Sequence, residues 1–136
     1  MDVKHLDGIA LFQNLSREQR EEVARVADEI DVDAGKRLVS AGRFGYEFFV
    51  IEDGTAEVVR GDEHIADLGP GDFFGEMAIL SDTVRSADVV ASSHMTAMVM
   101  TDSQFRHLAR RMPEVAEKIR EACRARTQKL QAEAEA

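Results

Sequence analysis

Residues 71 to 87 contain the side chains of this sequence that are best suited to ligand chemistry. The run is Gly-Asp-Phe-Phe-Gly-Glu-Met-Ala-Ile-Leu-Ser-Asp-Thr-Val-Arg-Ser-Ala, which separates Glu76 from Arg85 by nine positions. An arginine can pair with a phosphate through two of its donors, and Gly71 and Gly75 allow backbone N–H groups to approach an anion closely. Because a carboxylate repels a phosphate, we expect Glu76 to accept a hydrogen bond from a sugar hydroxyl. The run therefore predicts a site for a nucleotide with a single phosphate charge.

The composition bounds the class of protein. The chain has 136 residues, of which 44% are hydrophobic and 32% charged, as expected for one globular domain that can bury a core. Its net charge is −9, which argues against direct binding to nucleic acid. No apolar run is long enough to span a membrane, and no signal pattern opens the chain, so we expect a cytoplasmic protein without a membrane partner. The single cysteine, Cys123, excludes an internal disulfide.

The order of patterns predicts one domain, residues 1–136, built from helices, a β-roll and helices again. Residues 1 to about 30 are expected to be helical: Ser16 and Gln19 have the spacing of a capping box, and apolar residues up to Ile30 recur at helical intervals. From about residue 35 to 101, short β-rich runs alternate with glycines, which is typical of a small antiparallel β-roll or jelly-roll. The fold class expected is thus mainly β with flanking helices.

Two further helices are expected over residues 102 to about 131. Thr101 and Gln104 repeat the capping-box spacing, and Pro113 suits the first turn of the last helix. The Gln-Ala-Glu-Ala-Glu-Ala ending has high helix propensity but no apolar face, so residues 132–136 are expected to fray.

These residues resemble the cyclic-nucleotide-binding domains, which occur in the catabolite activator protein, in regulatory subunits of cyclic-AMP-dependent kinase and in nucleotide-gated channels. The phosphate-binding cassette of that family is matched without a gap by Gly71, Phe73, Phe74, Gly75, Glu76, Met77, Ala78, Leu80, Arg85, Ser86 and Ala87. The resemblance extends over roughly residues 8 to 131. One departure is Val84, where many members have proline, and this should only loosen the turn.

The resemblance implies a role for each matching position. Arg85 would pair with the cyclic phosphate and Glu76 would bind the ribose 2′-hydroxyl. The Ser86 hydroxyl would lie near phosphate and base, and Ala87 ends the motif. The backbone amides of the cradle would come from Gly75, Met77, Ala78 and Ser86.

Other positions would contact the base. Val58, Ala66 and Phe74 correspond to residues that line the base or ribose pocket. The final helix acts in this family as a lid, and Arg126 falls where one bacterial channel places its lid arginine; the alternative is an arginine exposed to solvent on a helix of mixed charge. Serine at position 86 favours cAMP over cGMP, because threonine at that place in the family accompanies cGMP.

The resulting hypothesis is a non-catalytic sensor or regulatory domain that binds cAMP, with cGMP as the alternative, and that couples closure of the cassette to movement of the C-terminal helix. We expect an effector protein as partner, a homodimer is left open, and no cofactor is expected. The alternatives are a regulatory domain of a larger transcription factor, transporter, channel or enzyme, and an enzyme or metal-binding cupin built on a β-roll. The last is disfavoured because the four histidines are dispersed along the chain, without a pattern of metal ligands.

Overall fold

The computed structural model describes residues 1–40, 46–75 and 87–135, with the side chains of 126–135 excepted. Two short 3₁₀ helices, η1 (Val3–Leu6) and η2 (Ala10–Phe12), precede α1 (Arg17–Val26). The predicted capping box is confirmed, since the Gln19 N–H donates to Ser16 Oγ at 3.1 Å and the Ser16 N–H donates to Gln19 Oε1 at 2.9 Å. The sequence therefore specifies where α1 begins.

The expectation that residues up to about 30 are helical is wrong at its C-terminal end. Helix α1 ends at Val26, and β1 occupies Asp28–Val32. In β1 the side chains alternate: Ile30 and Val32 pack against the cluster between the two sheets, whereas Glu29 and Asp31 are polar. A strand buries these two apolar residues on one face, which a continuing helix would not do.

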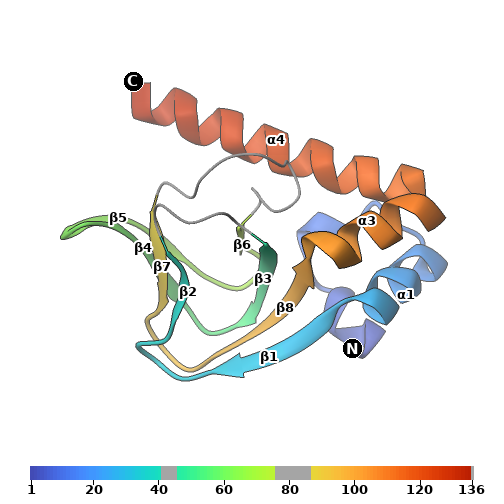
Figure 1. Ribbon diagram of the computed structural model, residues 1–136, viewed down its shortest axis with the longest axis horizontal. Helices are drawn as coiled ribbons and strands as arrows, with labels where there is room; N and C mark the ends of the chain where they lie inside the picture. Colours follow the sequence, from blue (N-terminus) through green and yellow to red (C-terminus); the bar gives the residue numbers. More distant parts are fainter. Residues whose placement is uncertain (41–45, 76–86, 136) are drawn as a thin grey trace.

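In the part of the chain that the structure describes, eight strands form two four-stranded antiparallel sheets, which confirms the predicted β-roll (Figure 1). The helix-side sheet has the order β1-β8-β3-β6 and the outer sheet has the order β2-β7-β4-β5. Besides β1, the strands are β2 (Arg37–Val39), β3 (Glu47–Asp53), β4 (Ala56–Arg60), β5 (Glu63–Leu68), β6 (Phe73–Phe74), β7 (Asp88–Ala91) and β8 (Met95–Thr101).

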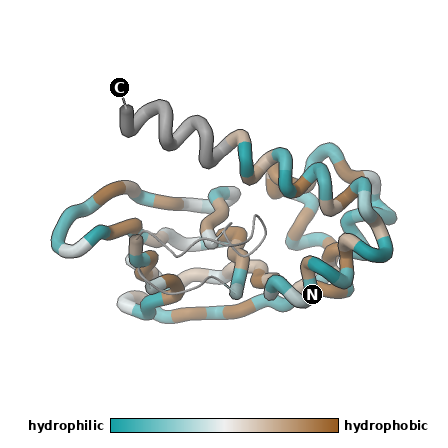
Figure 2. The backbone as a smooth tube through the Cα atoms, turned by 45° about the horizontal axis from the view of Figure 1, so that its top comes forward, coloured by the Kyte–Doolittle hydropathy of each residue, from teal (hydrophilic) through white to brown (hydrophobic). Residues whose placement is uncertain are grey.

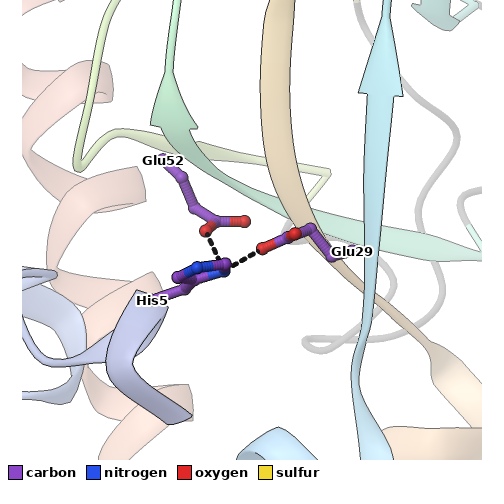
Figure 3. A group of neighbouring side chains, drawn as sticks. All are labelled: His5, Glu29 and Glu52. Atoms are coloured by element: carbon purple, nitrogen blue, oxygen red, sulfur yellow. Dashed lines mark hydrogen bonds and ion pairs between the residues drawn. The ribbon is translucent and has the colours of Figure 1, made fainter. Parts of the chain in front are cut away.

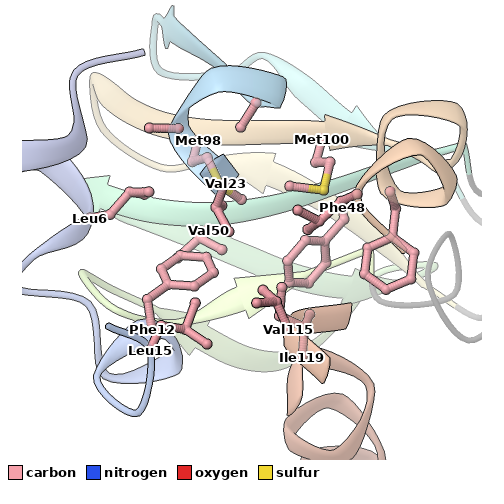
Figure 4. Close-up of a cluster of buried hydrophobic side chains, with 14 of the residues drawn as sticks. Leu6, Phe12, Leu15, Val23, Phe48, Val50, Met98, Met100, Val115 and Ile119 are labelled. Atoms are coloured by element: carbon pink, nitrogen blue, oxygen red, sulfur yellow. The ribbon is translucent and has the colours of Figure 1, made fainter. Parts of the chain in front are cut away.

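The two central strands of the helix-side sheet, β8 and β3, are buried on both faces, as β3 illustrates. Phe48 and Val50 pack into the cluster shared with the helices, and Phe49 and Ile51 pack into the cluster between the sheets. Strand β8 divides its side chains in the same way. Figure 4 shows the first cluster, in which side chains of the 3₁₀ segment, α1, β3, β8 and α4 meet. A strand with two apolar faces reads as a continuous apolar run, as Phe48–Ile51 does.

The C-terminal helices pack at the same end of the helix-side sheet as η1 and α1 (Figure 1). Helix α3 (Asp102–Arg111) begins at the second predicted capping box, in which the Gln104 N–H donates to Thr101 Oγ1 at 3.1 Å. Helix α4 (Pro113–Glu135) starts at Pro113, as predicted, and continues beyond the end expected near residue 131. Figure 2 shows the hydropathy of the chain in a second view, in which hydrophilic residues recur along the outer parts of the helical end.

Candidate functional site

The first part of the predicted cassette contains β6, the edge strand of the helix-side sheet. Phe74 pairs with Phe49 of β3, and the two rings stack with centroids 4.8 Å apart. Gly75, which follows directly, has a φ of 76°, a left-handed conformation that favours glycine. The chain thus leaves β6 at a glycine, which allows the left-handed turn, and directly after the Phe74 ring, which is fixed by stacking on Phe49.

A second glycine turn fixes the chain just before β6. Gly71 has a φ of 90°, and its N–H donates to the Ile51 carbonyl at 2.8 Å. The Ile51 N–H in turn donates to the Asp72 carbonyl at 2.9 Å, and the Gly69 N–H donates to Asp72 Oδ2 at 2.8 Å. These bonds join the entry of the cassette to the middle of β3, where Phe48 to Ile51 are buried.

The other end of the cassette attaches to the outer sheet. Half-buried Ala87 leads into β7, which pairs with β2 on one side and β4 on the other. Further bonds hold the end of β7: the Gly35 N–H donates to the Ala91 carbonyl at 2.7 Å, and the Ala91 N–H donates to the Lys36 carbonyl at 2.9 Å. The described residues before and after positions 76–86 therefore adjoin different sheets, β6 of the helix-side sheet on one side and β7 of the outer sheet on the other.

Five predicted ligand residues of the cassette, and the predicted lid residue, fall outside what the structure describes. These are Glu76, Met77, Ala78, Arg85 and Ser86, together with the side chain of Arg126. Their roles stay predictions. The structure does place the remaining five predicted residues, Gly75, Ala87, Phe74, Val58 and Ala66.

Val58 and Ala66 lie opposite each other on β4 and β5, and Val58 also lies opposite Val89 of β7. Residues directly opposite on neighbouring strands direct their side chains to the same face. Val58 packs against the cluster between the sheets, to which Phe74 and Val89 belong. The predicted pocket-lining residues of both sheets therefore face one apolar interior, which suits a flat base or a sugar but supplies no charge for a phosphate.

One polar cluster in the structure was missed by the sequence analysis. His5 of η1 lies between two carboxylates, Glu29 of β1 and Glu52 of β3 (Figure 3). His5 Nδ1 donates to Glu29 Oε2 at 2.5 Å and lies 3.3 Å from Glu52 Oε1. Ligands that share a Zn²⁺ ion with bonds of about 2.0–2.2 Å stand roughly 3.3 Å apart. The shorter His5–Glu29 separation is that of a hydrogen bond, so this cluster is arranged around a proton.

The environment of this cluster shifts two pKa values upward. Burial, followed by the neighbouring Glu29 carboxylate, raises the pKa of Glu52 to about 7. The hydrogen bond to Glu29 raises the pKa of His5. No short-range sequence pattern could have revealed this group, because His5 and Glu29 are 24 positions apart and meet only through the packing of η1 on the sheet.

The family model of the cyclic nucleotide-binding domain matches residues 29–112, which include both sheets and the cassette. The chain therefore belongs to the cyclic nucleotide-binding domain family. This confirms the family resemblance and the β-roll fold expected from the sequence.

Individual relatives agree with this assignment. The chain is 33% identical over 104 residues to the cAMP-dependent protein kinase regulatory subunit of Schizosaccharomyces pombe, covering 76% of this chain and 25% of the relative. It is 36% identical over 112 residues to a cyclic nucleotide-gated potassium channel of Rhizobium etli, covering 82% of this chain and 31% of the channel. The chain thus spans about a quarter to a third of the length of these two relatives.

A solved structure shows the same fold. The catabolite activator protein of Thermus thermophilus superimposes with a TM-score of 0.79 at 25% identity, over 92% of this chain and 61% of that one. In the described part of this chain, no helix is both long and apolar enough to cross a membrane.

Proposed function

We propose that this chain is a non-catalytic sensor domain that binds a cyclic nucleotide, with cAMP preferred over cGMP. The observation that carries the proposal is the cassette of residues 71–87, which lies within the matched family region and is attached at one end to each sheet. The names of the relatives support it, since one is a cAMP-dependent kinase regulatory subunit and another a cyclic nucleotide-gated channel.

In the proposed binding mode, three kinds of protein group bind the nucleotide: charged side chains, backbone N–H groups and apolar side chains. The Arg85 guanidinium neutralises the cyclic phosphate, and Glu76 accepts a hydrogen bond from the ribose 2′-hydroxyl. Backbone N–H groups of Gly75, Met77, Ala78 and Ser86 complete the phosphate cradle. The apolar interior described above supports this arrangement, because Phe74, Val58 and Ala66 offer surface to the base or ribose without competing for the charge.

The proposed signal is a movement of the C-terminal helices. Residues of α3 and α4 share one hydrophobic cluster with β3 and β8, so a shift of the cassette next to β6 has a packed route to the helices. Arg126 of α4 would then close over the base. The ligand can shift this equilibrium only by the difference between its affinities for the open and closed states.

The output of such a sensor requires another protein or another domain. Both curated relatives described above are much longer than the region they share with this chain, which supports a regulatory role toward an effector. We propose an effector protein as partner, with an attached output domain as the alternative; self-association into a homodimer is a further proposal that sizing in solution can test.

Calorimetric titration with cAMP and cGMP, side by side, tests the proposal. Arg85→Ala should lose a charge-assisted pair and weaken cAMP binding by about 2–4 kcal/mol, roughly 30- to 900-fold. The matched control is Arg110→Ala, which removes an exposed arginine of α3 and should leave the affinity unchanged. Equal affinity of wild type and Arg85→Ala would refute the phosphate role, and absence of heat with either nucleotide would refute the receptor function. Ser86→Thr should raise the affinity for cGMP relative to cAMP.

A further inference from the structure

The His5–Glu29–Glu52 cluster lies where the N-terminal 3₁₀ segment meets the helix-side sheet (Figure 3). His5 comes from η1, while Glu29 and Glu52 come from β1 and β3, which flank β8. Both contacts of His5 use the same ring nitrogen, Nδ1. One nitrogen therefore joins the segment to two strands of the sheet.

The second oxygen of Glu52 gives this cluster its dependence on protons. The Glu52 side chain is only 11% exposed, and Glu52 Oε2 is buried without a hydrogen-bond partner among the residues that the structure describes. In Figure 3 the Glu52 carboxylate lies beside that of Glu29. A buried, ionised oxygen without a donor is costly, and two facing carboxylates repel each other. A protonated Glu52 avoids both penalties, because it carries no charge and its O–H can donate a hydrogen bond to a carboxylate.

The cluster also supports the position of a buried anchor. Leu6 follows His5 directly, is fully buried, and belongs to the same hydrophobic cluster as Phe105, Leu108, Val115 and Ile119 of α3 and α4. A loss of contact at His5 would therefore loosen a segment that shares one hydrophobic cluster with both C-terminal helices.

We propose that this cluster is a proton-operated latch, which holds the N-terminal segment on the helix-side sheet when protonated and releases it as the pH rises. The contact is strongest when His5 is cationic and Glu52 is neutral, because the cationic ring then donates its Nδ1–H to the ionised Glu29 and Glu52 adds no second negative charge. When both protons are lost, one neutral imidazole faces two carboxylates. The inference concerns the docking of the N-terminal segment and does not depend on nucleotide binding.

Other charged groups near the latch leave this assignment intact. On the segment itself, the charge of Asp2 interacts electrostatically with His5, and the charge of Lys4 interacts with Asp2. On β1, the charge of Asp31 interacts with Glu52. Strand β8, Met95–Thr101, has no titratable side chain. The ion pairs of α1 lie elsewhere: Arg17 pairs with Glu21, Arg20 with Asp7, and Glu22 with Arg25 and Arg111.

The sign and the pH window follow from the two pKa values. Both are raised in the docked state, so docking binds protons and undocking releases them. For Glu52 the contribution is complete below about pH 4.5 and is lost as the pH rises to about 7. For His5 it is complete below 6.5 and is lost as the pH rises through the raised pKa. The latch therefore weakens as the pH rises from about 4.5 to about 7, and it weakens further above pH 6.5 as His5 loses its proton.

Hydrogen exchange measured by mass spectrometry or NMR from pH 5 to 8, in a chelator-containing buffer, tests the latch. The readout is the protection of the segment's hydrogen-bonded amides, such as those of His5, Asp7 and Ile9, relative to the amides of β8 in the same molecule. After correction for intrinsic exchange, we expect this ratio to fall about tenfold or more, because each released proton allows up to tenfold per pH unit.

Two variants distinguish the contribution of the Glu52 proton to the pH dependence from that of the His5 proton. Glu52→Gln imitates the neutral carboxyl, so the ratio should become flat between pH 5 and about 6.5 and exceed that of wild type at pH 8. His5→Gln should remove the change above pH 6.5, and this half-exposed position tolerates the change without loss of the fold. The matched control is His64→Gln, which removes a histidine bound to a carboxylate on the β4–β5 pair and should leave the ratio as in wild type.

Three outcomes would overturn the proposal. The first is a wild-type ratio that does not change between pH 5 and 8. The second is an unaltered pH dependence in both Glu52→Gln and His5→Gln. The third is a wild-type loss of protection that is equal in the segment and in β8, since this would indicate global unfolding.

Discussion

Phe49 and Phe74 stack in parallel between the two sheets, with ring centroids 4.8 Å apart and an angle of 15° between the ring planes. Strand β6 has only two residues, so this stack supplies much of what holds it to β3. Within the cassette, the chain turns away from β6 at Gly75, immediately after the stacked ring. The position of the entry to the proposed nucleotide site is thus a consequence of aromatic packing in the core.

Phe74→Ala should therefore lower both stability and nucleotide affinity. The ring is 4% exposed, and removing a buried phenylalanine costs about 3–5 kcal/mol of unfolding free energy. Phe74→Leu keeps most of the apolar volume and should cost less, about 1.5 kcal/mol. Chemical denaturation of the two variants measures the difference. Equal stabilities would show that the stack does not fix β6.

Gly54 provides a second prediction, on the β3–β4 connection. Its φ is 88°, and a Cβ built there would lie 2.8 Å from Met95 Cα and still closer to the His94 carbonyl oxygen. Gly54→Ala should therefore cost about 3 kcal/mol, since both backbone strain and a clash with main-chain atoms arise. Gly61→Ala is the matched control: its φ is also positive, at 62°, but nothing lies within 4 Å. It should cost about 1 kcal/mol, for strain alone. Similar denaturation midpoints for the two variants would contradict the role of the clash.

Local signals in the sequence predicted most of the elements. Ser16 and Thr101 begin α1 and α3 because each capping box is complete within four residues. Of the eight strands in the described residues, all but β1 lie within the β-rich span expected over about 35–101, since apolar runs and bounding glycines are also local features. The resemblance to the family then identified the cassette.

The errors occurred where tertiary contacts override local patterns. The apolar residues of α1 and β1 continue at helical spacing through Ile30, yet Ile30 faces the core between the sheets as part of a strand. Strand β6 is too short to produce a period of two. The His5–Glu29–Glu52 cluster depends on the register of β1 and β3 against β8, which sequence reasoning did not provide.

The β4–β5 pair provides a pH-dependent prediction. His64 Nδ1 lies 2.7 Å from Glu57 Oε1, and this hydrogen bond raises the pKa of His64. A raised pKa means that the contact stabilises the fold below about pH 6.5, and that this contribution is lost as the pH rises through the raised pKa. Glu57→Gln should lower the pKa of His64, as an NMR titration of the imidazole protons would measure. Glu63→Gln, on the same strand pair, should shift it far less. The assignment is wrong if both variants titrate alike.

The contact between α1 and α3 rests on a buried carboxylate and gives the last prediction. Glu22 is 5% exposed, and its Oε2 accepts a hydrogen bond from Arg25 of the same helix at 2.7 Å. Its Oε1 forms an ion pair with Arg111, at the end of α3, at 2.8 Å. Glu22→Gln keeps the shape of the side chain but removes the charge, which should cost about 1.5–3 kcal/mol, the usual value of hydrogen bonds to a charged group. The neighbouring Glu21 is the matched control, because it pairs with Arg17 in an exposed contact 3.2 Å long. Exposed pairs of this kind contribute about 0.3–0.5 kcal/mol, so Glu21→Gln should be nearly neutral. Urea denaturation of both variants decides the matter: if Glu22→Gln is as stable as Glu21→Gln, the Glu22–Arg111 contact does not hold α1 to α3, and apolar packing joins the helices.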